Sequence, residues 1–260
     1  MELLAPIPLL ALSAIFFLTS IVSVVTGSTS LITVPAMLQF GIEPRSAVAT
    51  NMLALTCMSV GGSVAFRGKH VIDRSRLPLL IVLTLAGSII GAVLLLMMPA
   101  RVMPLIIAIL MVAVAVFSVV KRDAGISPVE RQASRRAEMA GYAATFVLGV
   151  YGGFFSGGYV TLLTAAFVAL FGMTFVQAVS TTKLVNAFSS LVATLIFMWR
   201  GLVDYRLGML LGIIMFVRAL IGGHITVRLS NLWLRRIFLA AVVALALKTL
   251  LYDFLCKLLA

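Results

Sequence analysis

The chain has 260 residues, of which 62% are apolar and only 11% are charged, and its mean hydropathy is +1.19. Soluble domains average about 45–50% apolar and about 25% charged residues, so the composition excludes an ordinary soluble domain. The net charge of +12 comes from basic residues in short loops between apolar runs, which is typical of membrane proteins and does not require a nucleic-acid partner. We therefore predict an all-α polytopic membrane protein that lies in the lipid bilayer.

Apolar runs that approach or exceed the roughly 20 residues needed for a transmembrane helix occur along the whole chain. In chain order these expected spans are 5–25, 46–66, 77–98, 102–120, 139–155, 177–199, 207–225 and 237–251. Two shorter apolar pieces, 31–40 and 160–171, follow the first and fifth spans and are preceded by the small residues TGSTS and SGG. Because broken backbone is not tolerated against lipid, we expect two broken helices whose breaks face protein or water.

The two halves of the chain resemble each other. With a shift of 131 residues, Gly27 falls on Gly158, Gly41 on Gly172, and SAVATN (46–51) on QAVSTT (177–182). We infer an internal duplication, with a first transmembrane repeat at 1–120, a cytoplasmic linker at 121–138 and a second repeat at 139–260. Each repeat is expected to hold a hairpin with a short or broken helix and three full transmembrane helices. We favour inverted repeats, but parallel repeats with four crossings each stay open because loop charge does not decide between them.

Several motifs resemble the TauE/SafE sulfite exporter family. These are the VP of the first short segment (34–35), GIEPRSAVATN (41–51), the loops FRGKHVID (66–73) and WRGLVD (199–204), and STTK (180–183). The sequence departs from the family where TGSTS replaces a glycine-rich stretch and where LLTAAF lacks a proline. The resemblance covers nearly the whole chain. It implies a multi-pass permease of a bacterial cytoplasmic membrane that carries sulfite, sulfonates such as sulfoacetate, or other small organosulfur anions.

A lysine inside the sixth long span is the first candidate for the binding site. A charge in a span costs about 2.5–3.5 kcal/mol on insertion scales, so Lys183 calls for an explanation. Its neighbours Thr181 and Thr182, together with Asn186 on the same helix face, add hydroxyl and amide donors to the ammonium. Such donors suit the oxygens of sulfite or a sulfonate, and we therefore predict an anion site. The alternative is that Lys183 snorkels towards the membrane interface.

The duplication adds a second group of candidates. Thr50 and Asn51 occupy the positions of Thr181 and Thr182, so we expect the anion to lie between the two repeats. Interhelical hydrogen bonding is the alternative role for Thr50 and Asn51. The two breaks are also expected to aim helix N-terminal amides at the anion. The break residues proposed to line the site are Ser28, Thr29, Ser30, Gly157, Gly158 and Tyr159.

The remaining features restrict the function. Arg218 is a second intramembrane cation and a candidate for the substrate path. None of the eight acidic residues lies deep within an expected span, and the sequence has no Walker motif and no metal-ligand cluster. We therefore expect no catalytic residue, metal or cofactor, and a transporter instead of an enzyme. Since a monoanion that leaves a cell gains about 2.3 kcal/mol per 100 mV, export needs no coupling ion and is favoured. An anion-selective channel, a proton-coupled importer and a homo-oligomer stay open.

Overall fold

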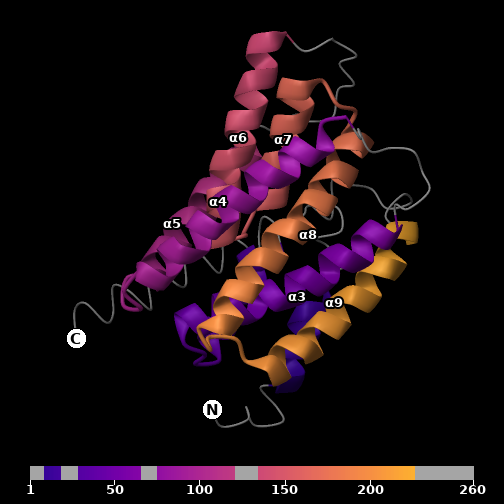
Figure 1. Cartoon of the computed structure of the whole chain (residues 1–260). Coiled ribbons are helices and arrows are strands. Elements are labelled where there is room, and N and C mark those ends of the chain that lie inside the picture. Colours follow the sequence, from indigo (N-terminus) through magenta and orange to yellow (C-terminus); the bar gives the residue numbers. More distant parts are fainter. Residues whose placement is uncertain (1–8, 19–28, 66–74, 121–133, 226–260) are drawn as a thin grey trace.

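The computed structural model describes residues 9–18, 29–65, 75–120 and 134–225, and within these ranges the backbone forms helices and no strand (Figure 1). The expected span at 237–251 and the candidate residue Ser28 lie outside the described residues. The first expected span is described at Leu9–Leu18, where it is helical. The prediction of an all-α fold is confirmed for the described part of the chain.

Eight labelled helices follow the first segment in the described ranges. Their bounds are α2 (Ser30–Gln39), α3 (Pro44–Ala65), α4 (Leu77–Met97), α5 (Met103–Val120), α6 (Arg135–Phe154), α7 (Tyr159–Phe171), α8 (Phe175–Trp199) and α9 (Tyr205–Ile225). The bounds agree with the expected segments within two residues, except that α6 begins four residues earlier. Two of the described helices are long and apolar enough to span a membrane. They are α4 (Leu77–Met97) and the part of α8 at Gln177–Trp199, with mean hydropathies of 2.8 and 1.4.

Local capping explains where several helices begin. Before α6, the Ser134 hydroxyl accepts a hydrogen bond from the backbone nitrogen of Ala137, and Glu138 in the first turn complements the helix dipole. The last residues of the polar linker therefore belong to the helix. Before α8, Thr174 and Gln177 form a capping box, in which each side chain accepts from the backbone of the other.

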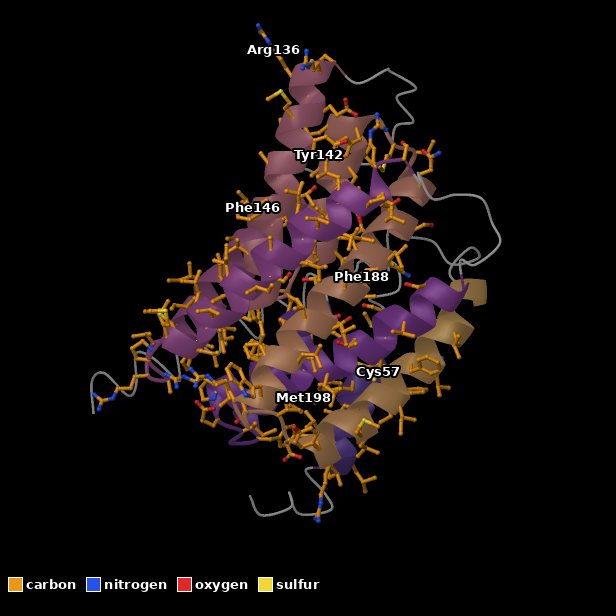
Figure 2. The ribbon with its side chains drawn as sticks, in the orientation of Figure 1. Cys57, Arg136, Tyr142, Phe146, Phe188 and Met198 are labelled. Carbon is orange, nitrogen blue, oxygen red and sulfur yellow. The ribbon has the colours of Figure 1, made fainter. Side chains whose placement is uncertain are left out.

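The bundle exposes large apolar side chains and buries many polar ones within its apolar core. Val82 of α4, Leu195 of α8 and Ile213 of α9 are between 55% and 60% exposed, whereas many Ser, Thr and Asn side chains are buried. Figure 2 shows Arg136 at the free end of α6, beyond Tyr142 and Phe146, so the charged end of this helix extends away from the bundle. An apolar outer surface with charge at a helix end is typical of a helical membrane protein.

The helices that come from different halves of the chain pack closely. α4 packs on α6, α3 packs on α9, and α8 contacts both α3 and α4. Between α4 and α6 the backbones approach through glycines: a Cβ on Gly91 would lie 2.0 Å from the carbonyl oxygen of Val150, and one on Gly153 would lie 2.2 Å from that of Ser88. Small residues at such contacts let transmembrane helices pack by van der Waals contact.

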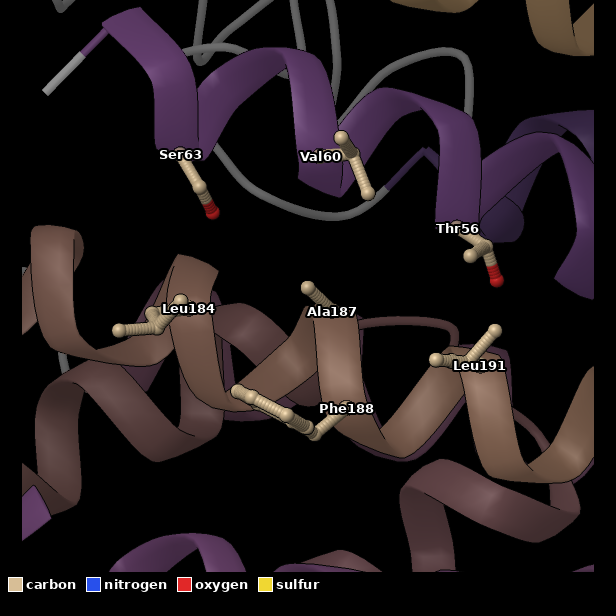
Figure 3. A pocket seen from close by; sticks show the side chains of 7 residues that line it. All are labelled: Thr56, Val60, Ser63, Leu184, Ala187, Phe188 and Leu191. Carbon is tan, nitrogen blue, oxygen red and sulfur yellow. The ribbon is translucent and has the colours of Figure 1, made fainter. Parts of the chain in front are cut away.

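α3 and α8 cross in opposite directions. Thr56 lies 3.2 Å from Thr194 between their hydroxyl oxygens, while Ser59, further along α3, accepts a 2.7 Å hydrogen bond from Asn186, earlier on α8. Figure 3 shows the same order, with Thr56 facing Leu191 and Ser63 facing Leu184. The two helices therefore run antiparallel, with the C-terminal part of α3 beside the N-terminal part of α8.

Candidate functional site

Three consecutive hydroxyl groups on α8 are buried without a hydrogen-bond partner. Ser180, Thr181 and Thr182 are 2%, 0% and 0% exposed, and among the described residues none of their side-chain oxygens makes a hydrogen bond. A buried hydroxyl without a partner costs about 1–3 kcal/mol in mutational data, so three in a row are uncommon. This turn of α8 therefore offers hydrogen-bond donors that no described residue uses.

Lys183 follows these hydroxyls and extends towards the other half of the chain. A Cβ on Gly62 of α3 would lie 3.5 Å from Cδ of Lys183 and 4.0 Å from its Nζ. The ammonium thus lies against the C-terminal part of α3, at the contact between the two halves. Since Lys183 stands eight residues after the start of α8 at Phe175, it is about 12 Å along the helix. The structure therefore places the cation within the bundle, on the same face of α8 as Ser180, which lies one turn earlier.

Asn186 lies one turn beyond Lys183 and ties α8 to α3. It is 3% exposed, its side-chain amide nitrogen donates to the Ser59 hydroxyl at 2.7 Å, and its backbone carbonyl oxygen accepts from the Ser190 hydroxyl. The amide nitrogen is already used by the protein. Asn186 can position the helices around the site, but it offers fewer free donors than the three hydroxyls before Lys183.

The candidates from the first half form a closed hydrogen-bond network. The amide nitrogen of Asn51 donates to the Ser30 hydroxyl at 2.9 Å, and its oxygen accepts from the Thr33 hydroxyl at 2.7 Å. The Ser30 hydroxyl also lies 2.8 Å from that of Ser156 in the second break. Each group in this network has a protein partner, as buried polar groups usually do. The network connects α2, α3 and the segment before α7.

Thr50 also has a structural partner. Its hydroxyl oxygen accepts a 3.0 Å hydrogen bond from the backbone nitrogen of Asp204, whose carboxylate in turn accepts from the backbone nitrogen of Leu207 at the start of α9. Thr50 therefore supports the cap of α9. The other two acids that the structure describes, Glu43 and Glu138, also lie at helix ends, where they accept from Ser46 and Arg76.

The structure does not bring the candidates on α3, Thr50 and Asn51, close to those on α8 around Lys183. Asn51 precedes Gly62, the neighbour of Lys183, by eleven residues, which corresponds to about 16 Å along α3. Thr181, Thr182 and Lys183 remain together on one helix. Thr50 and Asn51 lie towards the opposite end of α3, in interhelical hydrogen bonds.

The second break occupies residues 155–158, between α6 and α7. Gly158 has a φ of +79°, a left-handed conformation that favours glycine, and a Cβ there would lie 2.3 Å from a methyl carbon of Val114. A Cβ on Gly157 would lie 2.7 Å from a methyl carbon of Leu31 in α2, and the Tyr151 hydroxyl donates to the carbonyl oxygen of Gly157. The two glycines therefore allow the break to pack against α2.

The first residues of α2 and α7 meet at this break. Ser30 opens α2, and its partner Ser156 lies just before the N-cap of α7, while the Thr29 hydroxyl donates to the sulfur of Met58 at 3.6 Å. Neither helix has a side-chain cap at its N-terminus. The N-terminal ends of α2 and α7, the positive ends of their helix dipoles, thus lie close together.

Tyr159 points away from the Ser30–Ser156 contact. Its hydroxyl is fully buried, faces Thr84 of α4 and Ser189 of α8, and makes no hydrogen bond of good geometry. Ser88 bonds Ser189 at 2.6 Å beside it. The sequence singles out Tyr159 by its position after the break, but Thr84, Ser88 and Ser189 carry no comparable signal because only tertiary packing brings them together.

Arg218 lies at the level of Lys183 but on another side of α3. Gly61 faces α9: a Cβ built on Gly61 would lie 3.4 Å from the Cβ of Ala219. Gly62, the next residue, faces Lys183 of α8 instead. The guanidinium carbon of Arg218 lies 4.1 Å from the ring centroid of Phe17, a cation–π contact, and its Nε finds no hydrogen-bond partner in the part of the chain that the structure describes. Among the described residues no group of His, Cys, Asp and Glu could hold a metal ion.

Comparisons with known proteins identify one family and several membrane-transporter relatives. The sequence profile described as "Sulfite exporter TauE/SafE" matches residues 12–249. The chain is 27% identical over 251 residues to the "Probable membrane transporter protein YfcA" of Escherichia coli (strain K12), covering 94% of this chain and 91% of that protein. It is 27% identical over 239 residues to the "Probable membrane transporter protein ORF9" of Sinorhizobium sp, covering 90% and 89%. No solved structure matches the chain.

Proposed function

The chain belongs to the sulfite exporter TauE/SafE family of membrane transporters, and from this membership we propose that it carries small sulfur oxyanions, such as sulfite or short sulfonates. The anion binds on α8, at the contact between the two halves. Ser180, one turn before Lys183 on the same face of α8, donates a hydrogen bond to its oxygens, and Lys183 supplies the opposite charge. Thr181 and Thr182, on the adjoining sides of the helix, line the path of the anion.

The observation that carries this proposal is the buried hydroxyl of Ser180 on the face of α8 that carries Lys183. This hydroxyl has no hydrogen-bond partner among the described residues, and together with an ammonium it matches an anion that has several oxygens and a negative charge. Binding of such an anion removes the cost of burying the hydroxyl alone. Asn186 holds α8 against Ser59 and thereby keeps the site at the contact between the halves.

We further propose that the two halves are inverted repeats. The third helices of the two halves, α3 and α8, cross in opposite directions, as the order of their contacts indicates. Each of them also packs on the fourth helix of the other half, α3 on α9 and α8 on α4. Both features support a two-fold relation in the membrane plane. Rocking of one half against the other would then expose the anion to alternate sides.

We place the transporter in the bacterial cytoplasmic membrane and propose that it exports its substrate. The membrane potential favours the exit of an anion by about 2.3 kcal/mol per 100 mV. The three acids that the structure describes cap or pair at helix ends, which supports a mechanism without a carboxylate seat for a coupling ion. Arg218 stays outside the proposed site because it stacks on Phe17.

The test is sulfite or methanesulfonate flux in liposomes, measured per folded transporter. We expect Lys183→Ala to abolish saturable flux, because the anion loses its counter-charge. Arg136→Ala is the matched control, since it removes one positive charge from the exposed end of α6. Saturation and counterflow in the wild type identify a carrier and not a channel. Equal flux for Lys183→Ala and wild type would overturn the proposal.

A further inference from the structure

The end of α8 and the start of α9 form an aromatic and basic surface at one end of the bundle (Figure 1). Trp199 is 85% exposed and Tyr205 is 52% exposed, and both Arg200 and Arg206 are exposed. The guanidinium carbon of Arg200 lies 5.8 Å from the ring centroid of Trp199, in a cation–π contact. We name these four residues, which belong to the WRGLVD motif or follow it, the α8–α9 surface. The proposed anion site leaves them without a role.

The backbone holds the α8–α9 surface in a defined shape. Gly201 has a φ of +67°, a left-handed conformation that favours glycine. At the far side of the turn, the backbone nitrogen of Asp204 donates to the Thr50 hydroxyl of α3, and the Asp204 carboxylate caps α9. Among the described residues, Arg200 and Arg206 pair with no carboxylate. Their positive charges are therefore available to a partner outside the bundle.

Two further arginines lie at the same end of the bundle. Arg45, in the first turn of α3, donates to the carbonyl oxygen of Met98 at the end of α4, and Arg101 follows in the exposed turn before α5. Glu43 accepts from the backbone at the start of α3, so it serves as a helix cap like Asp204. In the described part of this end, arginines thus outnumber carboxylates, and positive charge is in excess.

This end of the bundle lies at a membrane surface. The apolar span Gln177–Trp199 ends at the α8–α9 surface, so the two rings lie where the hydrocarbon core meets the head groups. The linker at 121–138, which we expect in the cytoplasm, leads into α6, and α6 begins beside the start of α4, at the opposite end. The arginines at the end of α8 therefore lie on the side away from the linker, where the positive-inside rule does not account for them.

We propose that the α8–α9 surface binds the head groups of anionic phospholipids. Arg200 and Arg206 pair with phosphate groups, whose oxygens suit the planar guanidinium, and the rings of Trp199 and Tyr205 lie beside the glycerol and carbonyl groups below them. A dissolved anion would use the arginines without the exposed rings, so the combination favours a lipid. Trp199 lies about 24 Å beyond Lys183 along α8, and lipid binding here does not depend on the proposed transport.

The experiment measures how brominated lipids quench the fluorescence of Trp199 in vesicles that hold the full chain. Trp233→Phe is the background, because it leaves Trp199 as the only tryptophan. Brominated phosphatidylglycerol and brominated phosphatidylcholine with the same acyl chains are compared at equal mole fractions. We expect a relative binding constant that favours phosphatidylglycerol. Arg200→Gln and Arg206→Gln should each lower this preference about fivefold, because each removes one positive charge near the lipid surface.

Matched variants decide whether this surface is the cause. Arg135→Gln should keep the preference, since Arg135 is exposed at the opposite end, in the first turn of α6. Lys183→Ala should also keep it, which separates this inference from the proposed function. Equal quenching by the two lipids, or a preference that survives the loss of both Arg200 and Arg206, would overturn the inference. Quenching of Trp199 by aqueous iodide and by neither lipid would place the surface in water and would overturn it as well.

Discussion

Two turns that correspond in the halves of the chain use similar side chains in different ways. Thr50 and Asn51 on α3 align with Thr181 and Thr182 on α8 under the shift of 131 residues. On α3, Thr50 supports the cap of α9, and Asn51 bonds Ser30 and Thr33. On α8, the hydroxyls of Thr181 and Thr182 are equally buried and have no partner among the described residues.

This difference separates a structural role from a binding role. A polar group whose hydrogen bonds are complete within the protein stabilises the fold and has little to offer a ligand. A buried group without a partner lowers stability until something binds to it. After a duplication, one copy of a polar turn can keep the helices together while the other copy binds. The predictions below test this division, from the largest expected effect to the smallest.

Loss of Asn51 should have the largest effect, and the effect should fall on stability. Asn51→Leu leaves the hydroxyls of Ser30 and Thr33 without their amide partner inside the bundle, and unpaired buried groups cost about 1–3 kcal/mol each. We expect the apparent melting temperature of the purified protein to fall clearly. The dissociation constant for methanesulfonate of the molecules that remain folded should not change. A weaker affinity at unchanged stability would place Asn51 in the binding site.

Loss of a hydroxyl on α8 should have the opposite signature. Ser180→Ala removes a donor from the face of α8 that carries Lys183, so binding should weaken by about 1–3 kcal/mol. Stability without substrate should be equal or higher, because this buried hydroxyl has no partner among the described residues. Thr145→Val is the matched control, since that buried hydroxyl donates to the carbonyl oxygen of Gly141 in its own helix. Calorimetric affinity and thermal unfolding of both variants check the prediction; unchanged affinity for Ser180→Ala would contradict it.

A smaller effect is expected at the second intramembrane cation. Phe17→Leu removes the ring under the Arg218 guanidinium, and such contacts are worth about 0.5–2 kcal/mol. We expect a modest loss of thermal stability and no change in the Michaelis constant for flux. A changed Michaelis constant would show that Arg218 belongs to the substrate path and would bring both cations into the mechanism.

The smallest effect should come from the surface. Arg76 and Glu138 form an ion pair at 2.8 Å with both side chains about one-third exposed. Exposed pairs contribute about 0–1 kcal/mol, so Glu138→Gln should change the melting temperature little and flux not at all. A large loss of stability would indicate that the junction between α4 and α6 depends on this pair and not on its glycine contacts.

The sequence predicts much of the fold because run lengths of apolar residues set the lengths of membrane helices. It places the ends of α3, α4 and α8 within two residues. The start of α6 is missed because capping by Ser134 extends the helix into a polar stretch that hydropathy assigns to the linker. Lys183 can be found because a charge within an apolar run is conspicuous.

The role of each candidate residue could not be predicted in the same way. Whether Asn51 binds a ligand or another helix depends on Thr33 and Ser30, which reach it only through the packing of α2 on α3. The position of Val60 opposite Ala187 likewise depends on the antiparallel crossing of α3 and α8. An alignment of the two halves predicts the same role for equivalent residues. Only their tertiary contacts show which residue is bonded within the protein and which is not.

The central claim, that the anion binds at Lys183 on α8, is tested most directly by calorimetric titration of methanesulfonate into three proteins: wild type, Lys183→Met and Arg218→Met. Methionine keeps much of the apolar length of both side chains and removes only the charge. The account predicts that Lys183→Met loses measurable binding, while Arg218→Met binds with the affinity of the wild type. Equal binding by Lys183→Met and wild type would contradict the account.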